Sequence, residues 1–189
     1  MYSSWTPDAN GYSYVDLGLP SGTLWATMNV GASSEEDGGL YFQWGDTQGY
    51  TASQVGVDKV FDKSTYKYYD GTTEYDGTTE VLWNEYRRED IYTKYNYLDF
   101  KVGLEDQDDA AHVNMGGDWH IPSDAHWNEM LNNTTKETVE INQKVCVKYT
   151  GTNGNYIIIP CCGNACNSGV YGSGHGEYWL DSIFAVYLG

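Results

Sequence analysis

The segment from Gly116 to Ser123 constrains the fold of this chain more than any other part of the sequence. It reads Gly-Gly-Asp-Trp-His-Ile-Pro-Ser, and the residues after it place Trp127, Met130 and Leu131 on one face of a helix. Two glycines let the backbone turn sharply before the tryptophan, the proline ends an extended stretch, and serine is a favoured helix N-cap. The sequence therefore predicts a tight turn into a short amphipathic helix that begins after Ser123.

The other predicted elements are equally short. A first helix is predicted from about Gln107 to Asn114, with acidic residues in its first turn, where the helix dipole favours them. Strands are predicted over 12–17, 40–44 and 156–160, an apolar run covers 23–30, and Val139 to Tyr149 is strand-like. We expect an α+β fold with two short helices, short antiparallel strands and long loops. Residues 1–11 would form a loose leader and residues 12–189 one domain.

Residues 47–98 are polar, rich in tyrosine and weakly periodic, and we interpret them as a long insertion. They contain a tandem repeat in which residues 69–74 are followed by a near-identical copy at 75–80. One repeat of six residues is too short for a solenoid, and its Asp-Gly steps favour tight turns. The repeat therefore predicts a surface hairpin or loop.

The charge of the chain excludes one class of partner. Its 27 acidic and 10 basic residues give a net charge of -17, which opposes binding to nucleic acid or to an anionic membrane. No stretch is long and apolar enough to suggest membrane insertion. The 18 tyrosines and 22 glycines are typical of recognition surfaces, although an irregular β-rich domain held together by tyrosines would share this composition.

Five motifs are more specific than composition: residues 15–26, 41–46, 108–114, 116–123 and 178–179. Together, over roughly residues 12–188, they resemble the major paralogous domain family first noted in Fibrobacter and abundant in gut Bacteroides and their phages. That family is similar to the formylglycine-generating branch of the C-type-lectin fold. The resemblance implies a C-type-lectin-like scaffold with a shared set of buried tryptophans, at Trp25, Trp44, Trp119 and Trp127.

One position departs from the family pattern. The resemblance suggests glutamate where the chain has His126, and glutamate there would close a capping box with Ser123. We therefore expect a weakened cap at the start of the second helix.

The C-terminal segment, residues 161–184, departs most from the family pattern. Its glycine and tryptophan positions match, while the residues between them differ, which resembles the variable proteins of diversity-generating retroelements. Such elements randomise adenines, and from Cys161 to Gly189 the chain has no Lys, Met, Gln or Thr. Sequence drift in a glycine-rich loop is the alternative. The candidate ligand-binding residues are Cys162, Asn164, Ala165, Cys166, Asn167, Tyr171, Ser173, His175, Leu180, Asp181, Ile183 and Phe184.

The resemblance implies a binding protein of the receptor-recognition or adhesin type, outside the cell on a bacterial surface or phage virion. Its partner would be a protein or glycan on a cell surface. The alternative is a carbohydrate-binding lectin with a fixed, calcium-assisted site, for which hard oxygen ligands are available at Glu105, Asp106, Asp108 and Asp109. A solvated helix start would explain the same acidic run, and no other cofactor is expected.

A third reading is an oxidase of the formylglycine-generating type, because Cys161 and Cys166 have the cysteine spacing of that class. No Arg or Lys follows Lys148, however, so basic neighbours that would lower a thiol pKa are absent from this part of the sequence. We therefore expect no enzyme activity and thiol pKa values that are normal or raised. Cys161 and Cys162 should face opposite sides if the strand continues through them.

The four histidines show no triad-like grouping with a nucleophile. His120, inside the most specific motif, is expected to be a core or hydrogen-bonding residue.

Overall fold

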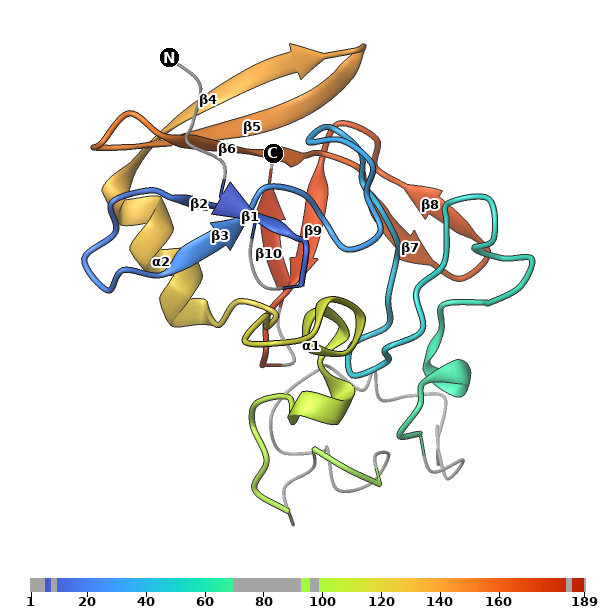
Figure 1. Ribbon diagram of the computed structural model, residues 1–189. Coiled ribbons are helices and arrows are strands. Elements are labelled where there is room, and N and C mark those ends of the chain that lie inside the picture. Colours follow the sequence, from blue (N-terminus) through green and yellow to red (C-terminus); the bar gives the residue numbers. More distant parts are fainter. Residues whose placement is uncertain (1–5, 8–9, 70–92, 96–98, 183–184, 189) are drawn as a thin grey trace, which may run out of the picture.

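The computed structural model describes residues 6–7, 10–69, 93–95, 99–182 and 185–188 (Figure 1). In these residues two α-helices accompany short strands that pair antiparallel, which confirms the α+β prediction. The strands form two three-stranded sheets, ordered β1-β2-β3 and β4-β5-β6, and two further pairs, β7-β8 and β10-β9. No helix in the described part of the chain is long and apolar enough to cross a membrane.

The first sheet contains β1 (Thr6–Pro7), β2 (Ser13–Asp16) and β3 (Leu24–Ala26). Val15 lies opposite Trp25 in the β2–β3 register, and both side chains are buried. The predicted strand at 12–17 is thus present, and the apolar run at 23–30 contains the second. Thr6–Pro7 pairs with β2, so part of the predicted leader joins the sheet.

The predicted first helix is divided in two. A 3-10 helix covers Asp106–Asp108, and α1 covers Ala110–Met115. Asp109 between them has an extended backbone, with φ −85° and ψ 114°, and its carboxylate accepts a hydrogen bond from the His112 N–H. Asp109 is therefore the N-cap of α1, whereas Asp106 and Asp108 lie in the 3-10 helix before it.

The second helix, α2, spans Asp124–Asn133 and begins after Ser123, as predicted. Trp127 and Met130 are buried, whereas Leu131 is 40% exposed. The prediction of a weakened cap is wrong, because the capping box is complete. A histidine ring nitrogen is a hydrogen-bond acceptor within reach of the N-cap, as a glutamate carboxylate would be.

The second sheet follows α2 without a linker and consists of β4 (Thr134–Ile141), β5 (Lys144–Gly151) and β6 (Tyr156–Pro160). The two residues between β4 and β5, Asn142 and Gln143, have φ of 50° and 67°. Positive φ at both positions is what a two-residue hairpin turn of type I′ requires. In β6 every residue after Tyr156 is buried, in agreement with the predicted buried strand.

The remaining strands lie in the C-terminal part of the chain. They are β7 (Asn164–Cys166), β8 (Gly169–Tyr171), β9 (Gly176–Trp179) and β10 (Ala185–Leu188). Figure 1 shows β7 and β8 projecting at one side of the molecule, whereas β9 and β10 lie below the second sheet. The C-terminal segment therefore contains both an outlying hairpin and a strand pair next to the core.

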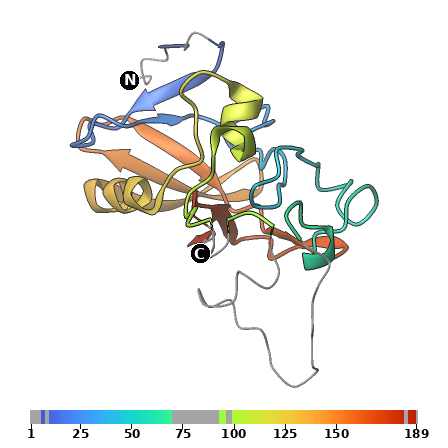
Figure 2. The same ribbon diagram turned by 90° about the horizontal axis from the view of Figure 1, so that it is seen from below.

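The hydrophobic core joins both sheets, α2 and the C-terminal segment. It contains Val15 and Trp25 from the first sheet, Val147 and Ile157 from the second, and Trp127 from α2. Helix α2 lies beside the second sheet in both views (Figures 1 and 2). The indole rings of Trp25 and Trp127 meet edge to face at 5.1 Å, a favourable aromatic geometry that links the first sheet to α2.

The central motif lies nearer the surface than the other predicted core tryptophans. Trp25, Trp44 and Trp127 are buried, whereas Trp119 is only half-buried. Of the two roles expected for His120, the core role does not apply, because 49% of its side chain is exposed. Both follow Gly116 and Gly117, whose positive φ values turn the chain along the surface before it enters α2.

The segment at 40–44 is not a strand. Among the described residues its β pairing consists of one isolated bridge, between Tyr41 and Tyr50. The described parts of the predicted insertion, residues 47–69 and 93–95, are irregular apart from isolated bridges and a 3-10 turn at Lys63–Thr65. From residue 70 onward the tandem repeat lies outside the described residues.

Candidate ligand-binding face

The C-terminal segment leaves the core at Cys161 and is held by backbone hydrogen bonds. The Gly163 N–H donates to the His175 carbonyl at 2.6 Å, and the Gly174 N–H donates to the Cys161 carbonyl at 3.2 Å. Gly163 has φ +77°, and a Cβ there would lie 2.1 Å from the carbonyl oxygen of Tyr171. Glycine is therefore required at position 163, because any larger residue would overlap the β8 backbone.

The tip of the β7–β8 hairpin is fixed by the insertion. Asn167 at the tip has φ 50°, a left-handed conformation that asparagine tolerates better than most residues. Phe61 and Asn167 exchange two backbone hydrogen bonds, of 2.9 and 2.8 Å. A Cβ at Gly56 would lie 2.2 Å from the Ser168 carbonyl oxygen, so the two backbones are in close contact. The beginning of the predicted insertion therefore supports this hairpin.

Side chains from the N-terminal half hold the end of the segment. The Tyr178 hydroxyl donates to the Pro160 carbonyl at 2.7 Å and accepts from the Asn29 amide at 3.1 Å. The Trp44 indole N–H donates to the Leu180 carbonyl at 2.9 Å. These bonds draw the Leu180 side chain into the core, where it is 4% exposed.

The motif at 41–46 supplies two more of these bonds. The Tyr41 hydroxyl donates to the Cys162 carbonyl at 2.7 Å, and the Trp179 indole N–H donates to the Phe42 carbonyl at 2.8 Å. Burial, and next the neighbouring Cys162 thiol, raise the pKa of Tyr41, so its hydroxyl remains the donor at neutral pH. This motif therefore acts as a support for the C-terminal backbone.

The predicted binding residues fall into four groups. Five are exposed, namely Cys166, Asn167, Tyr171, Ser173 and His175. Cys162, Asn164, Ala165 and Asp181 are half-buried. The prediction for Leu180 is wrong, since it is a core residue. Ile183 and Phe184 lie outside the described residues. We use the name recognition face below for the five exposed residues.

The cysteines lie in different environments. Strand β6 ends at Pro160, so the strand does not continue through the two adjacent cysteines and the condition for their predicted opposite orientation is not met. Cys161 belongs to the core, and Cys162 is half-buried beside the Tyr178 hydroxyl. Cys166 is exposed, and all four cysteines are free thiols. Burial raises the pKa of Cys146, Cys161 and Cys162, in agreement with the expected normal or raised values.

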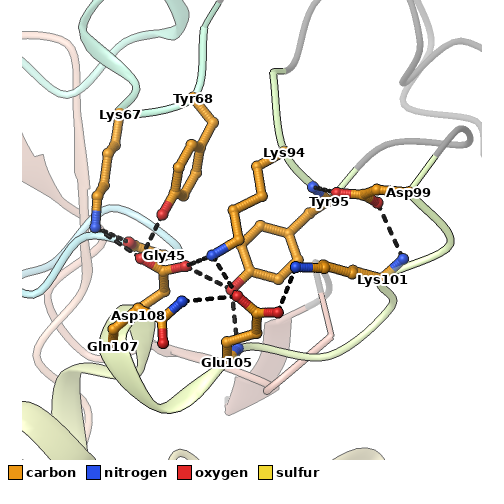
Figure 3. A network of polar contacts seen from close by, with 10 residues as sticks. All are labelled: Gly45, Lys67, Tyr68, Lys94, Tyr95, Asp99, Lys101, Glu105, Gln107 and Asp108. Carbon is orange, nitrogen blue, oxygen red and sulfur yellow. Dashed lines mark hydrogen bonds and ion pairs between the residues drawn. The ribbon is translucent and has the colours of Figure 1, made fainter.

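A second polar cluster surrounds the Asp108 carboxylate (Figure 3). Lys67 pairs with it at 2.7 Å, the Tyr95 hydroxyl donates at 2.6 Å, and Lys94 and the Tyr68 hydroxyl donate as well. The Asp108 side chain is only 1% exposed. Because its partners come from residues 67–68 and 94–95, this carboxylate fastens both ends of the predicted insertion to the helical region.

The pKa values of this cluster fix its charges. Burial alone would raise the pKa of Asp108, but hydrogen bonds from Lys67 and Lys94 outweigh it and hold that pKa well below its usual range. For Lys94, burial is outweighed by its bonds to Asp108 and Glu105, so its pKa is raised. Burial, followed by the bond to Asp108, raises the pKa of Tyr95 to about 12. At neutral pH the cluster therefore holds ionised carboxylates, ammonium groups and neutral phenols.

The acidic run proposed as a calcium site has other partners. Glu105 pairs with Lys94 at 2.7 Å and also with Lys101. Asp109 accepts from the His112 N–H at 2.9 Å and from the Ile121 N–H at 2.8 Å. Together with the lysine-bound Asp108, these carboxylates face different partners rather than one shared calcium ion.

Sequence reasoning missed the lysines of this cluster and the side chains that hold the C-terminal segment. Lys67 and Lys94 are two of only ten basic residues in an acidic chain, and that scarcity was a usable signal. The supporting roles of Asn29 and Tyr41 carry no local signal, because each partner lies more than 100 residues away in sequence.

The chain matches no protein-family model, no curated protein and no solved structure.

Proposed function

We propose that this chain is a C-type-lectin-like binding domain that presents its C-terminal segment as a variable recognition surface. Its partner would be a protein or a glycan on a cell surface, and its location a bacterial surface or a phage virion. One observation carries the proposal: the backbone of residues 161–182 is held by the scaffold while the side chains of the recognition face point to solvent.

This arrangement separates folding from recognition. The bonds at Gly163, Asn167 and Leu180 use backbone atoms of the segment, so they do not depend on which side chains the exposed positions carry. Exposed side chains contribute little to stability, so they can be exchanged at small cost, except at Asn167, where the left-handed backbone favours asparagine. Variation confined to such positions would change the ligand and leave the fold intact.

The exposed residues have suitable chemistry for recognition. Tyr171 is 54% exposed, and an aromatic side chain of this kind supplies contact area at small cost in conformational entropy. Asn167 and Ser173 add donors and acceptors. The surface could therefore bind a neutral or polar ligand without a metal.

The two alternatives receive less support. A calcium-assisted lectin site at residues 105–109 would have to displace Lys67, Lys94 and Lys101 from the carboxylates they pair with. An oxidase would need an activated thiol, whereas burial raises the pKa of Cys161, and Cys166 is in a different, exposed environment.

The proposal is tested by sequencing the DNA on both sides of the gene. We expect a near-repeat of the 3′ coding region close to a reverse transcriptase gene, with mismatches only at adenines. The mismatched codons should include those of Cys166, Asn167, Tyr171, Ser173 and His175, and should spare those of Gly163 and Trp179. A neighbourhood without such a repeat, or mismatches spread over core codons, would contradict the proposal.

A further inference from the structure

Three metal-binding side chains converge beside α1, apart from the residues assigned to recognition. They are Asp106 from the 3-10 helix, His112 from α1, and His120 from the turn before α2. One potential ligand atom from each lies within 4.8 Å of the others. The His112 and His120 rings stack with centroids 5.1 Å apart and planes inclined by 15°. Side chains from three separate segments thus reach a single point.

Asp109 holds the two histidines in this arrangement. Its carboxylate accepts hydrogen bonds from the backbone N–H groups of His112 and Ile121, at 2.9 and 2.8 Å. The same carboxylate lies 3.8 Å from Nδ1 of His120. A carboxylate behind an imidazole is the usual outer partner of a metal-bound histidine, because it orients the ring and makes the opposite nitrogen a better ligand. At 3.8 Å the Asp109 carboxylate lies beside the His120 ring but beyond hydrogen-bond distance of it, and it is itself buried.

His112 has a hydrogen-bonding capacity that the described residues leave unused. Its Nδ1 atom is buried and has no hydrogen-bond partner among them. Buried polar atoms in native proteins almost always have a partner, since leaving one unpaired costs free energy. The unpaired nitrogen indicates a partner that the described part of the chain does not supply.

We propose that Asp106, His112 and His120 form a binding site for a borderline divalent transition-metal ion of the Zn²⁺ type. Two imidazole nitrogens and one carboxylate oxygen suit Zn²⁺, whereas Ca²⁺ requires six or more oxygen ligands. Asp106 is exposed and 49% of the His120 side chain is exposed, so the remaining coordination position is open to water. A bound ion would join the 3-10 helix, α1 and the turn into α2.

The test uses the full chain, free of metal and without a polyhistidine tag. Titration with ZnCl₂ by calorimetry should show one equivalent bound, and CoCl₂ should give the visible absorption of a nitrogen- and oxygen-bound Co²⁺ ion. His120→Gln and His112→Gln should each weaken Zn²⁺ binding by at least about tenfold, and Asp106→Asn should weaken it less. Zn²⁺ should raise the melting temperature of the parent chain but not that of the His112→Gln/His120→Gln double variant.

His175→Gln is the matched control, because His175 is an exposed histidine that lies in the recognition face and outside the proposed metal site. It should bind Zn²⁺ as the parent does. Melting in the presence of EDTA shows whether each variant is folded, and if His112→Gln is not, the two exposed positions, His120 and Asp106, decide the question. If His120→Gln and Asp106→Asn bind Zn²⁺ as tightly as the parent does, or if the parent binds no Zn²⁺, the proposed site is wrong. Displacement of Co²⁺ by millimolar CaCl₂ would overturn the assigned class of metal.

Discussion

The imidazole of His126 accepts a hydrogen bond from the Ser123 backbone N–H at 3.2 Å, and the Ser123 hydroxyl accepts one from the His126 backbone N–H, also at 3.2 Å. Each side chain satisfies an N–H group that the start of a helix leaves without a partner. Trp127 follows directly in sequence and is 2% exposed. The cap therefore determines where α2 begins and, with it, where a central core residue is placed.

Replacing Ser123 by alanine should lower the free energy of unfolding by about 1 kcal/mol, because it removes the acceptor for the His126 N–H. His126→Glu should be as stable as the parent or slightly more stable, since a carboxylate can accept the same bond and is favoured at a helix N-terminus. Urea denaturation of the three proteins measures both effects. An alanine variant with the parent's midpoint would show that the cap contributes nothing.

Replacing Asp108 by asparagine should destabilise the chain by about 2–3 kcal/mol, because Lys94 and Lys67 would lose a buried carboxylate. This loss of stability is smaller than the loss expected for a fully buried ion pair, since Lys67 is 37% exposed and water screens its charge. Asp58→Asn is the control, because Asp58 is exposed. Urea midpoints measure the difference, and equal loss in both variants would contradict the assigned role of the cluster.

The Asp108 carboxylate should also make the stability of the chain depend on pH. The pKa of Asp108 is lowered in the folded state, so near that pKa the folded chain binds fewer protons than the unfolded chain does. Its contribution should be complete above the ordinary aspartate pKa of about 3.9 and should be lost as the pH falls from there to the lower folded-state pKa. Comparing the urea midpoints of the parent and Asp108→Asn at several pH values checks this. The gap between them should narrow only in that acidic window.

The features that were predictable have local causes. Ser123 starts α2 because serine caps helices, and β6 is recognisable because the apolar run before Pro160 is bounded by turn residues. In these cases the sequence neighbours alone determine the conformation or the environment.

The features that were missed depend on distant partners. The Leu180 carbonyl is bound by the Trp44 indole, 136 residues away, and nothing near Leu180 in sequence indicates its burial. Of strand β4 only the end from Val139 onward was predicted, because residues 134–138 are largely exposed and lack the alternation of apolar residues that marks most strands. The Asp108 cluster joins residues 13 to 41 positions apart. Tertiary contacts decided each of these outcomes, and local propensity carries no information about them.

Gly163→Ala and Gly172→Ala should differ sharply in stability although both glycines have similar positive φ, 77° and 76°. A Cβ at Gly172 meets no atom within 4 Å, so that variant should bear only the cost of a left-handed backbone, about 1 kcal/mol. At Gly163 the Cβ would overlap the Tyr171 carbonyl, which should add about 1–3 kcal/mol. Thermal melts of the pair separate backbone strain from overlap, and equal melting temperatures would refute the close contact.

The thiols should react in an order set by exposure. Cys166 is exposed and should react with Ellman's reagent in the native protein, whereas Cys146 and Cys161 should react only after unfolding. Burial also raises the pKa of both buried thiols, which lowers the fraction of reactive thiolate. Thiol titration with and without denaturant measures this. In Cys166→Ser the fast phase should disappear, and a fast phase that survives would mean that the half-buried Cys162 or a buried thiol is accessible.

Leu180→Ala and Tyr171→Ala test whether the C-terminal segment separates support from recognition. Leu180 is 4% exposed and lies in the core, so its truncation should cost about 2–4 kcal/mol. Tyr171 is 54% exposed, so its truncation should change the free energy of unfolding by no more than about 0.5 kcal/mol, although it removes the larger side chain. Urea denaturation of both variants against the parent gives the two values. A large loss at Tyr171 would mean that the exposed residues also hold the fold, and a segment of that kind could not accept the variation that the proposed function requires.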